Sequence, residues 1–136
     1  MLLSKLSRKE KLKYLDLALH MVEVDGSTTS HEQRLLNMML AEVGDDIVKE
    51  YSFFHSSDLD ETVEFFKSQS ISTRNIVFLN LIKLSMIDDF YNTSEHFFLE
   101  NIMKKFNISN AKRSDLVALV FEERDLKEKA RRICLT

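Results

Sequence analysis

The sequence predicts an all-α protein, a single-domain bundle of about seven or eight helices built from two pseudo-repeated helical hairpins. Three observations favour this fold class. The 136 residues include no proline and only two glycines, which is too few turn formers for a strand-rich fold. Apolar residues recur at helical spacing along most of the chain. The apolar share is 44%, and a chain of this length closes one core without cross-links, so residues 1–136 form one domain.

The first hairpin is predicted over about residues 7–44. Ser7 and Glu10 have the spacing of a capping box, in which each side chain binds the backbone N–H of the other residue. The following helix carries a wide apolar face and a narrow polar stripe that we expect to be solvated, consisting of Lys13, Asp16, His20 and Glu23. A second helix is expected over residues 30–43, and Gly44 ends it.

The second hairpin is predicted over about residues 73–107, after a polar break at 68–72. Its acidic turn repeats the acidic turn of the first hairpin at a constant offset. The separation between Asp25 and Asp88 is 63 positions, and that between Glu32 and Glu95 is the same. Residues 76–87 are the most apolar segment and predict the most buried helix. Asn107 stands where Gly44 stood, and asparagine is the next best residue for a left-handed helix end.

A C-terminal helical region is predicted over about residues 110–133. Its first half is apolar on one face, whereas residues 122–132 alternate in charge and are expected to be solvated. The preceding helix, which is the second helix of the second hairpin, has a predicted apolar face. This face is formed by Phe97, Phe98, Leu99, Ile102, Met103 and Phe106. Core filling is the default interpretation of the phenylalanine doublets. The alternative is that one member of a doublet faces the core and the other faces a partner.

The acidic turns are the first candidate site. Asp25, Glu32, Asp88 and Glu95 carry hard oxygen ligands that could hold a divalent cation. An EF-hand is excluded, because the twelfth loop position, which needs a glutamate, falls on Leu36 and on Leu99. The favoured interpretation needs no ligand, since the aspartates close turns and the glutamates complete capping boxes.

A second metal hypothesis uses one face of the first helix. Asp16, His20 and Glu23 lie at positions i, i+4 and i+7, which suits imidazole and carboxylate ligation. Carboxylate-bridged di-metal bundles, however, draw Glu-x-x-His pairs from facing helices, and here the order is His-x-x-Glu and occurs once. A solvated stripe with an Asp16–His20 hydrogen bond is therefore favoured.

Composition excludes several other functions. A net charge of −3 offers no basic face for nucleic acid, and no stretch is apolar enough to enter a membrane. The single cysteine, Cys134, cannot form an internal disulfide, which fits a reducing cytoplasm. The sequence holds no glycine-rich phosphate loop, nucleophile elbow or paired-cysteine motif, so we expect no enzyme.

The first acidic turn carries a family resemblance. From Leu17 to Gly26 the chain reads LALHMVEVDG, followed by Thr29 and then Glu32, and the next apolar helix ends at Gly44. This pattern resembles the Asp-Gly-x-x-Ser/Thr-x-x-Glu signature of the TerB-like family, the tellurite-resistance-associated all-helical domains. A weaker second copy covers residues 79–107, where the signature departs by placing Asp89 and Asn92 in the Gly and Ser/Thr positions.

The resemblance implies a helical bundle in the cytoplasm of a bacterium. Relatives include the N-terminal domains of membrane-anchored DnaJ-type co-chaperones, and the family is linked to tellurite resistance, stress response and phage defence. Its members are thought to act near the membrane as metal-associated or protein-interaction modules and not as enzymes. The family's acidic residues map to Asp25, Glu32, Asp88 and Glu95, although Lys83 near the second turn weakens an inherited metal site.

The leading hypothesis is a non-catalytic helical module that binds a protein partner, which the resemblance implies can be membrane-associated. In this hypothesis a divalent cation at the acidic turns tunes the binding of the partner. The first alternative is a metal-dependent hydrolase or redox enzyme that uses Asp16, His20 and Glu23. The second alternative is a purely structural homodimer.

Overall fold

The computed structural model describes residues 1–23, 30–51, 58–86 and 93–136, and every regular element within them is helical. This confirms the all-α prediction. In chain order the elements are the 3-10 turn η1 (Leu3–Lys5), α1 (Arg8–Glu23), α2 (Ser30–Val43), α3 (Asp45–Glu50), α4 (Leu59–Lys67), α5 (Ile71–Ser85), α6 (Thr93–Lys105) and α7 (Asn110–Leu135).

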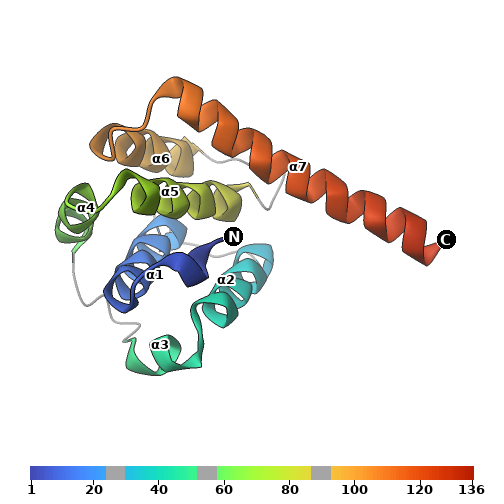
Figure 1. Ribbon diagram of the computed structural model, residues 1–136, viewed down its shortest axis with the longest axis horizontal. Helices are drawn as coiled ribbons and strands as arrows, with labels where there is room; N and C mark the ends of the chain where they lie inside the picture. The colour runs from blue at the N-terminus through green and yellow to red at the C-terminus, as the bar shows by residue number, and fades with distance from the viewer. Residues whose placement is uncertain (24–29, 52–57, 87–92) are drawn as a thin grey trace.

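Helix α5 is the central element. It packs against α1, α2, α4, α6 and α7, and in Figure 1 it lies between α6 on one side and α1 on the other. Nine of its fifteen residues are buried, including the polar Thr73, Asn80 and Ser85. The expectation that residues 76–87 contain the most buried helix is therefore met for the residues up to 86 that the structure describes.

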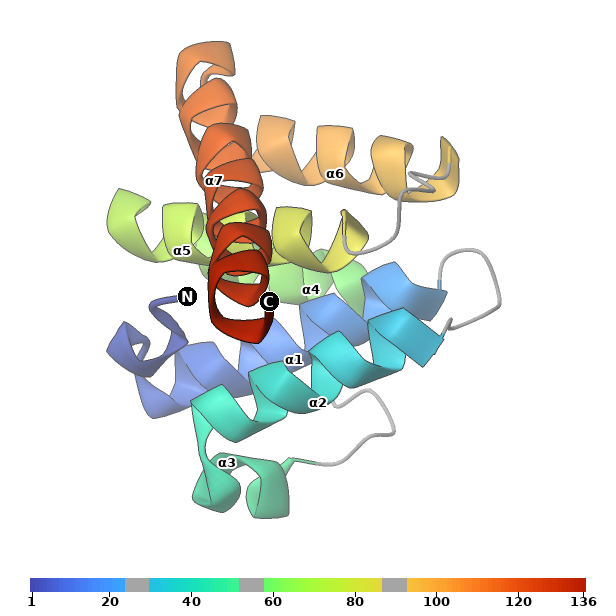
Figure 2. The same cartoon turned by 90° about the vertical axis from the view of Figure 1, so that its right-hand side faces the viewer.

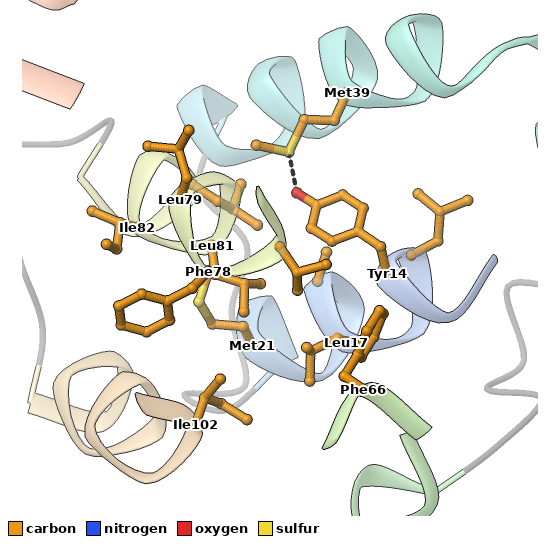
Figure 3. Packing of buried hydrophobic residues seen from close by; sticks show 14 of the residues in the cluster. Tyr14, Leu17, Met21, Met39, Phe66, Phe78, Leu79, Leu81, Ile82 and Ile102 are labelled. Atoms are coloured by element: carbon orange, nitrogen blue, oxygen red, sulfur yellow. Dashed lines mark hydrogen bonds between the residues drawn. The ribbon is translucent and has the colours of Figure 1, made fainter. Parts of the chain in front are cut away.

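The core is formed where α1 meets α5. Figure 3 shows Leu17 and Met21 of α1 facing Phe78 and Leu81 of α5, with α4 and α6 closing the sides through Phe66 and Ile102. All these side chains are almost fully shielded from water. Each such burial stabilises the fold by about 1.5–3 kcal/mol.

The helix starts follow local cap chemistry. The Ser7 hydroxyl accepts from Glu10 N–H (3.2 Å) and Glu10 Oε1 accepts from Ser7 N–H (2.7 Å), which confirms the predicted capping box. Ser70 caps α5 by accepting from Thr73 N–H (3.2 Å). The Thr73 hydroxyl in turn donates to Glu10 Oε2 (2.9 Å), so the first turns of α1 and α5 are joined.

The second hairpin was predicted to begin at 73, but α5 begins at Ile71 because Ser70, within the supposed polar break, is an N-cap. With this start, α5 begins 63 residues after α1 (71 − 8) and α6 begins 63 residues after α2 (93 − 30). The caps Ser7 and Ser70 are separated by the same number.

The two predicted left-handed helix ends both have positive φ. Asn107 has φ 58°, and Ile108 N–H donates to the Met103 carbonyl (3.1 Å), which closes the end of α6 as a Schellman motif. Gly44 has φ 103° and ψ 150°, a combination open almost only to glycine. The two differ because Gly44 leads directly into α3, whereas two residues separate Asn107 from α7.

One side-chain prediction for α6 needs correction. Phe97, assigned to the apolar face of α6, is 66% exposed, while its neighbour Phe98 is buried. Adjacent side chains on a helix point about 100° apart, and here Phe98 faces the core while Phe97 faces outward. The doublet alternative, with one ring inside and one outside, describes Phe97 and Phe98.

Helix α7 is much longer than its contact with the bundle. Its 26 residues cross α5, and its C-terminal half projects beyond the other helices (Figures 1 and 2). Leu116 and Val120 are its buried residues, and every residue from 124 onward is exposed. The prediction that residues 122–132 are solvated is confirmed, except that Glu123 is partly buried.

Candidate functional site

The prediction that the polar stripe of α1 is solvated is wrong for Asp16. Its side chain is fully buried and its Oδ1 accepts from the Tyr51 hydroxyl at 2.6 Å. Tyr51, at the C-terminal end of α3, is also buried. The stripe was expected to face water, but α3 folds back against α1 and covers it there. Asp16 therefore anchors α3 to α1.

The metal hypothesis for Asp16, His20 and Glu23 stays a prediction, because only two of its three side chains are described. His20 is partly buried, and the Glu23 side chain lies outside the described residues. Across the parts of the chain that the structure describes, no group of three or more histidine, cysteine, aspartate or glutamate side chains is placed to hold a metal ion.

The acidic turns fall mostly outside the described residues. Asp25 and Asp88 belong to segments 24–29 and 87–92, and of Glu32 only the backbone, within α2, is described. Glu95 is the third residue of α6 and is buried. A cation at Asp25, Glu32, Asp88 and Glu95 thus stays a prediction, as does the capping interpretation.

The described residues form a groove where α7 leaves the bundle. We call it the α7 groove; it has a volume of about 210 Å³ and is lined by Met38, Lys83, Met86, Val120, Phe121, Glu123, Arg124 and Lys127. These residues come from α2, from the C-terminal end of α5 and from the middle of α7. Met38 and Phe121 are exposed at its surface, so an apolar floor is open to an incoming side chain.

Charged groups surround this apolar floor. The Lys83 ammonium lies 2.7 Å from Glu123 Oε1, and Lys127 lies 3.3 Å from the same oxygen. Partial burial alone would raise the pKa of the Glu123 carboxyl. The hydrogen bond and charge of Lys83, followed by those of Lys127, outweigh this effect and hold the pKa below its ordinary value of 4.5.

This electrostatic arrangement limits the chemistry of the groove. Glu123 is ionised at neutral pH and bound by two cations, so it has no proton to donate as a general acid. The Arg124 guanidinium lies 4.8 Å from the Phe121 ring centre, a cation–π contact. With Lys83, Arg124 and Lys127 against one carboxylate, the groove has a net positive rim. It is suited to bind an apolar group next to an acidic one.

A second, shallower hollow of about 590 Å³ lies on the other side of Phe121. This hollow shares Met86 and Phe121 with the α7 groove and has more polar groups in its lining. It is lined by Met86, His96, Asn110, Arg113, Ser114, Val117, Ala118 and Phe121. Its arginine, Arg113, is already paired with Glu100. Both hollows are lined mainly by residues of α7.

Sequence reasoning missed the α7 groove. Lys83 was noted only as a residue near the second acidic turn, and Phe121, in the part of the C-terminal region predicted to be apolar on one face, is exposed. One signal could have found the groove: the apolar pattern of α7 continues into a charged segment that a bundle of this size cannot cover.

Comparison with protein-family models, with characterised proteins and with solved structures finds no match to this chain. None of the helices in the described ranges is long and apolar enough to cross a membrane.

Proposed function

We propose that this chain is a non-catalytic, TerB-like helical module of the bacterial cytoplasm that binds a protein partner in the α7 groove. The observation that carries this proposal is the exposed apolar floor of Met38 and Phe121 within a rim of cations. Apolar surface of this kind, bordered by charged residues, marks protein interaction sites.

The rim specifies the chemistry of the partner. Lys83, Arg124 and Lys127 outnumber Glu123, and an acidic residue on the partner would meet them at the edge of the groove. The partner segment therefore carries one or two large apolar side chains with aspartate or glutamate beside them. An amphipathic helix presents such a surface along one face.

The TerB-like part of the proposal draws on the duplication. The equal offsets between the starts of α1 and α5, and of α2 and α6, support a pair of helical hairpins derived from one ancestor. The Ser7 and Ser70 caps at the same spacing give further support. Tellurite is not assigned as a ligand, because none of these features recognises an oxyanion. A link to stress response comes from the family resemblance alone.

Site-specific photocrosslinking in host cells tests this proposal. A photoreactive amino acid at position 38 should yield one discrete adduct with another protein, and Phe121→Glu in the same chain should abolish it. The matched control places the photoreactive residue at position 97, which is at least as accessible but lies on α6 outside the groove. Absence of an adduct at 38, the same adducts from both positions, or an adduct only with a second copy of this chain would refute the proposal.

A further inference from the structure

The second half of α7 carries apolar side chains that the bundle leaves uncovered. We call residues 124–135 the α7 extension; at 1.5 Å per residue it projects by about 18 Å. Isolated helices of about a dozen residues are marginal in water, and most helical stability in proteins comes from packing one face. Ion pairs along the extension, such as Glu128 with Arg131, add only a few tenths of a kcal/mol each.

The exposed apolar residues form a regular line. Leu119, Leu126 and Ile133 are spaced by seven residues and are 45%, 67% and 67% exposed. We call them the α7 stripe. Seven residues are nearly two helical turns, so the three side chains lie along one face, and Ala130 lies on the same face between them. This is the spacing of one of the two seam positions of a coiled-coil heptad; the other position holds Glu123 and Ala130.

We propose that a second copy of this chain covers the α7 stripe, with the two α7 helices packed side by side and antiparallel. Centred near Asp125, this arrangement places Leu119 of each copy against Ala130 of the other. The same surface is used by both copies, as two-fold symmetry requires.

The charges beside the stripe favour a second copy over an unrelated partner. Glu122 and Lys129 border the stripe on its outer side, one heptad apart and with opposite sign. In the antiparallel pair each Glu122 meets Lys129 of the second copy, so two attractive contacts form and no like charges meet there. The helix is electrostatically complementary to itself when one copy is reversed.

Glu123 explains why the antiparallel direction is favoured over the parallel one. It lies at the seam between Leu119 and Leu126, and a parallel pair would place the two Glu123 carboxylates against each other. In the antiparallel pair Glu123 faces Leu126 of the second copy instead. Its carboxylate is also paired with Lys83 and Lys127 of its own chain, which partly offsets its charge beside Leu126.

Sedimentation equilibrium under reducing conditions, which keep Cys134 from forming a disulfide, tests this proposal. The wild-type mass should rise with concentration from 15.9 kDa toward twice that value. Leu126→Glu should weaken dimerisation at least about tenfold, because it removes two buried leucines per dimer. Leu135→Glu is the matched control: Leu135 is 77% exposed on the same helix, but it points away from the stripe, so the variant should dimerise like wild type.

A charge exchange tests the direction of the helices. Glu122→Lys alone should weaken the dimer about three- to tenfold at low salt. Adding Lys129→Glu should restore it, because the attractive pairs re-form with their signs exchanged. These side chains are exposed, so the variants keep the fold, which circular dichroism verifies.

A monomer at millimolar concentration would overturn the proposal. A dimer that Leu135→Glu disrupts and Leu126→Glu leaves intact would also overturn it, as would a charge exchange that fails to restore dimerisation. The α7 stripe and the floor of the α7 groove share no residue, so failure of the partner proposal leaves this inference standing and the reverse also holds.

Discussion

Removing one oxygen atom from Tyr51 should destabilise the protein markedly. The Tyr51 hydroxyl donates to the Asp16 carboxylate at 2.6 Å, and the two residues are 6% and 0% exposed. Hydrogen bonds to charged groups contribute about 1.5–3 kcal/mol each, and buried groups cannot replace the lost donor with water. Tyr51→Phe should therefore lower the free energy of unfolding by about 1.5–3 kcal/mol, or the melting temperature by about 3–5 °C per kcal/mol.

Tyr14→Phe is the matched control for this measurement. Tyr14 is also buried, but its hydroxyl donates to the Met39 sulfur (2.9 Å; Figure 3), and a thioether is a weak acceptor. Burial, with a smaller contribution from Glu42, raises the pKa of Tyr14, so its hydroxyl stays neutral. Tyr14→Phe should cost less than about 1 kcal/mol.

Urea unfolding of both variants, followed by circular dichroism at neutral pH, compares the two losses. The reasoning fails if Tyr51→Phe stays within about 0.5 kcal/mol of wild type, which is the usual effect of a surface substitution. It fails as well if the two variants lose the same free energy, because the Asp16 oxygen would then be no stronger an acceptor than the Met39 sulfur.

Three further predictions concern other parts of the chain. Glu123→Gln should lower the free energy of unfolding by about 1 kcal/mol at neutral pH. Pairing with Lys83 lowers the folded-state pKa of Glu123, so the stabilisation by its charge is present above the unfolded-state pKa of 4.5 and is lost as the pH falls through the folded-state pKa. Urea unfolding of wild type and variant at several pH values measures this dependence. Asn107→Ala should lower stability by about 1 kcal/mol and Asn107→Gly should not, since only the first strains a left-handed residue; equal melting temperatures would contradict this. In equilibrium dialysis with calcium, zinc and manganese, a site at the acidic turns predicts uptake that Asp25→Asn/Asp88→Asn abolishes, whereas no uptake, or uptake unchanged in that variant, rules the site out.

Local chemistry explains which parts of the fold the sequence could predict. The Ser7 capping box depends on residues three apart, and the left-handed end at Asn107 depends on one residue and its hydrogen bonds, so both can be recognised without a structure. The buried α5 was recognisable because its apolar residues cover nearly its whole circumference.

Tertiary packing explains what sequence reasoning got wrong. Asp16 has the helical position of a solvent-facing residue, but Tyr51, 35 positions later, returns to donate a hydrogen bond to its buried side chain. The α7 groove depends in the same way on side chains from α2, α5 and α7 that meet only in the folded chain. Periodicity shows that a helix has an apolar face, but it cannot show which element covers that face or whether any does.

Hydrogen exchange along α7 tests most directly whether this helix is an interaction element. If a second copy covers the α7 stripe, amides of residues 124–133 should exchange slowly in concentrated protein and rapidly in dilute protein, while those of α5 stay protected in both. Leu126→Glu should make exchange in residues 124–133 rapid at either concentration, and Leu135→Glu should not. Equal exchange of residues 124–133 in concentrated and dilute wild-type protein would contradict the account.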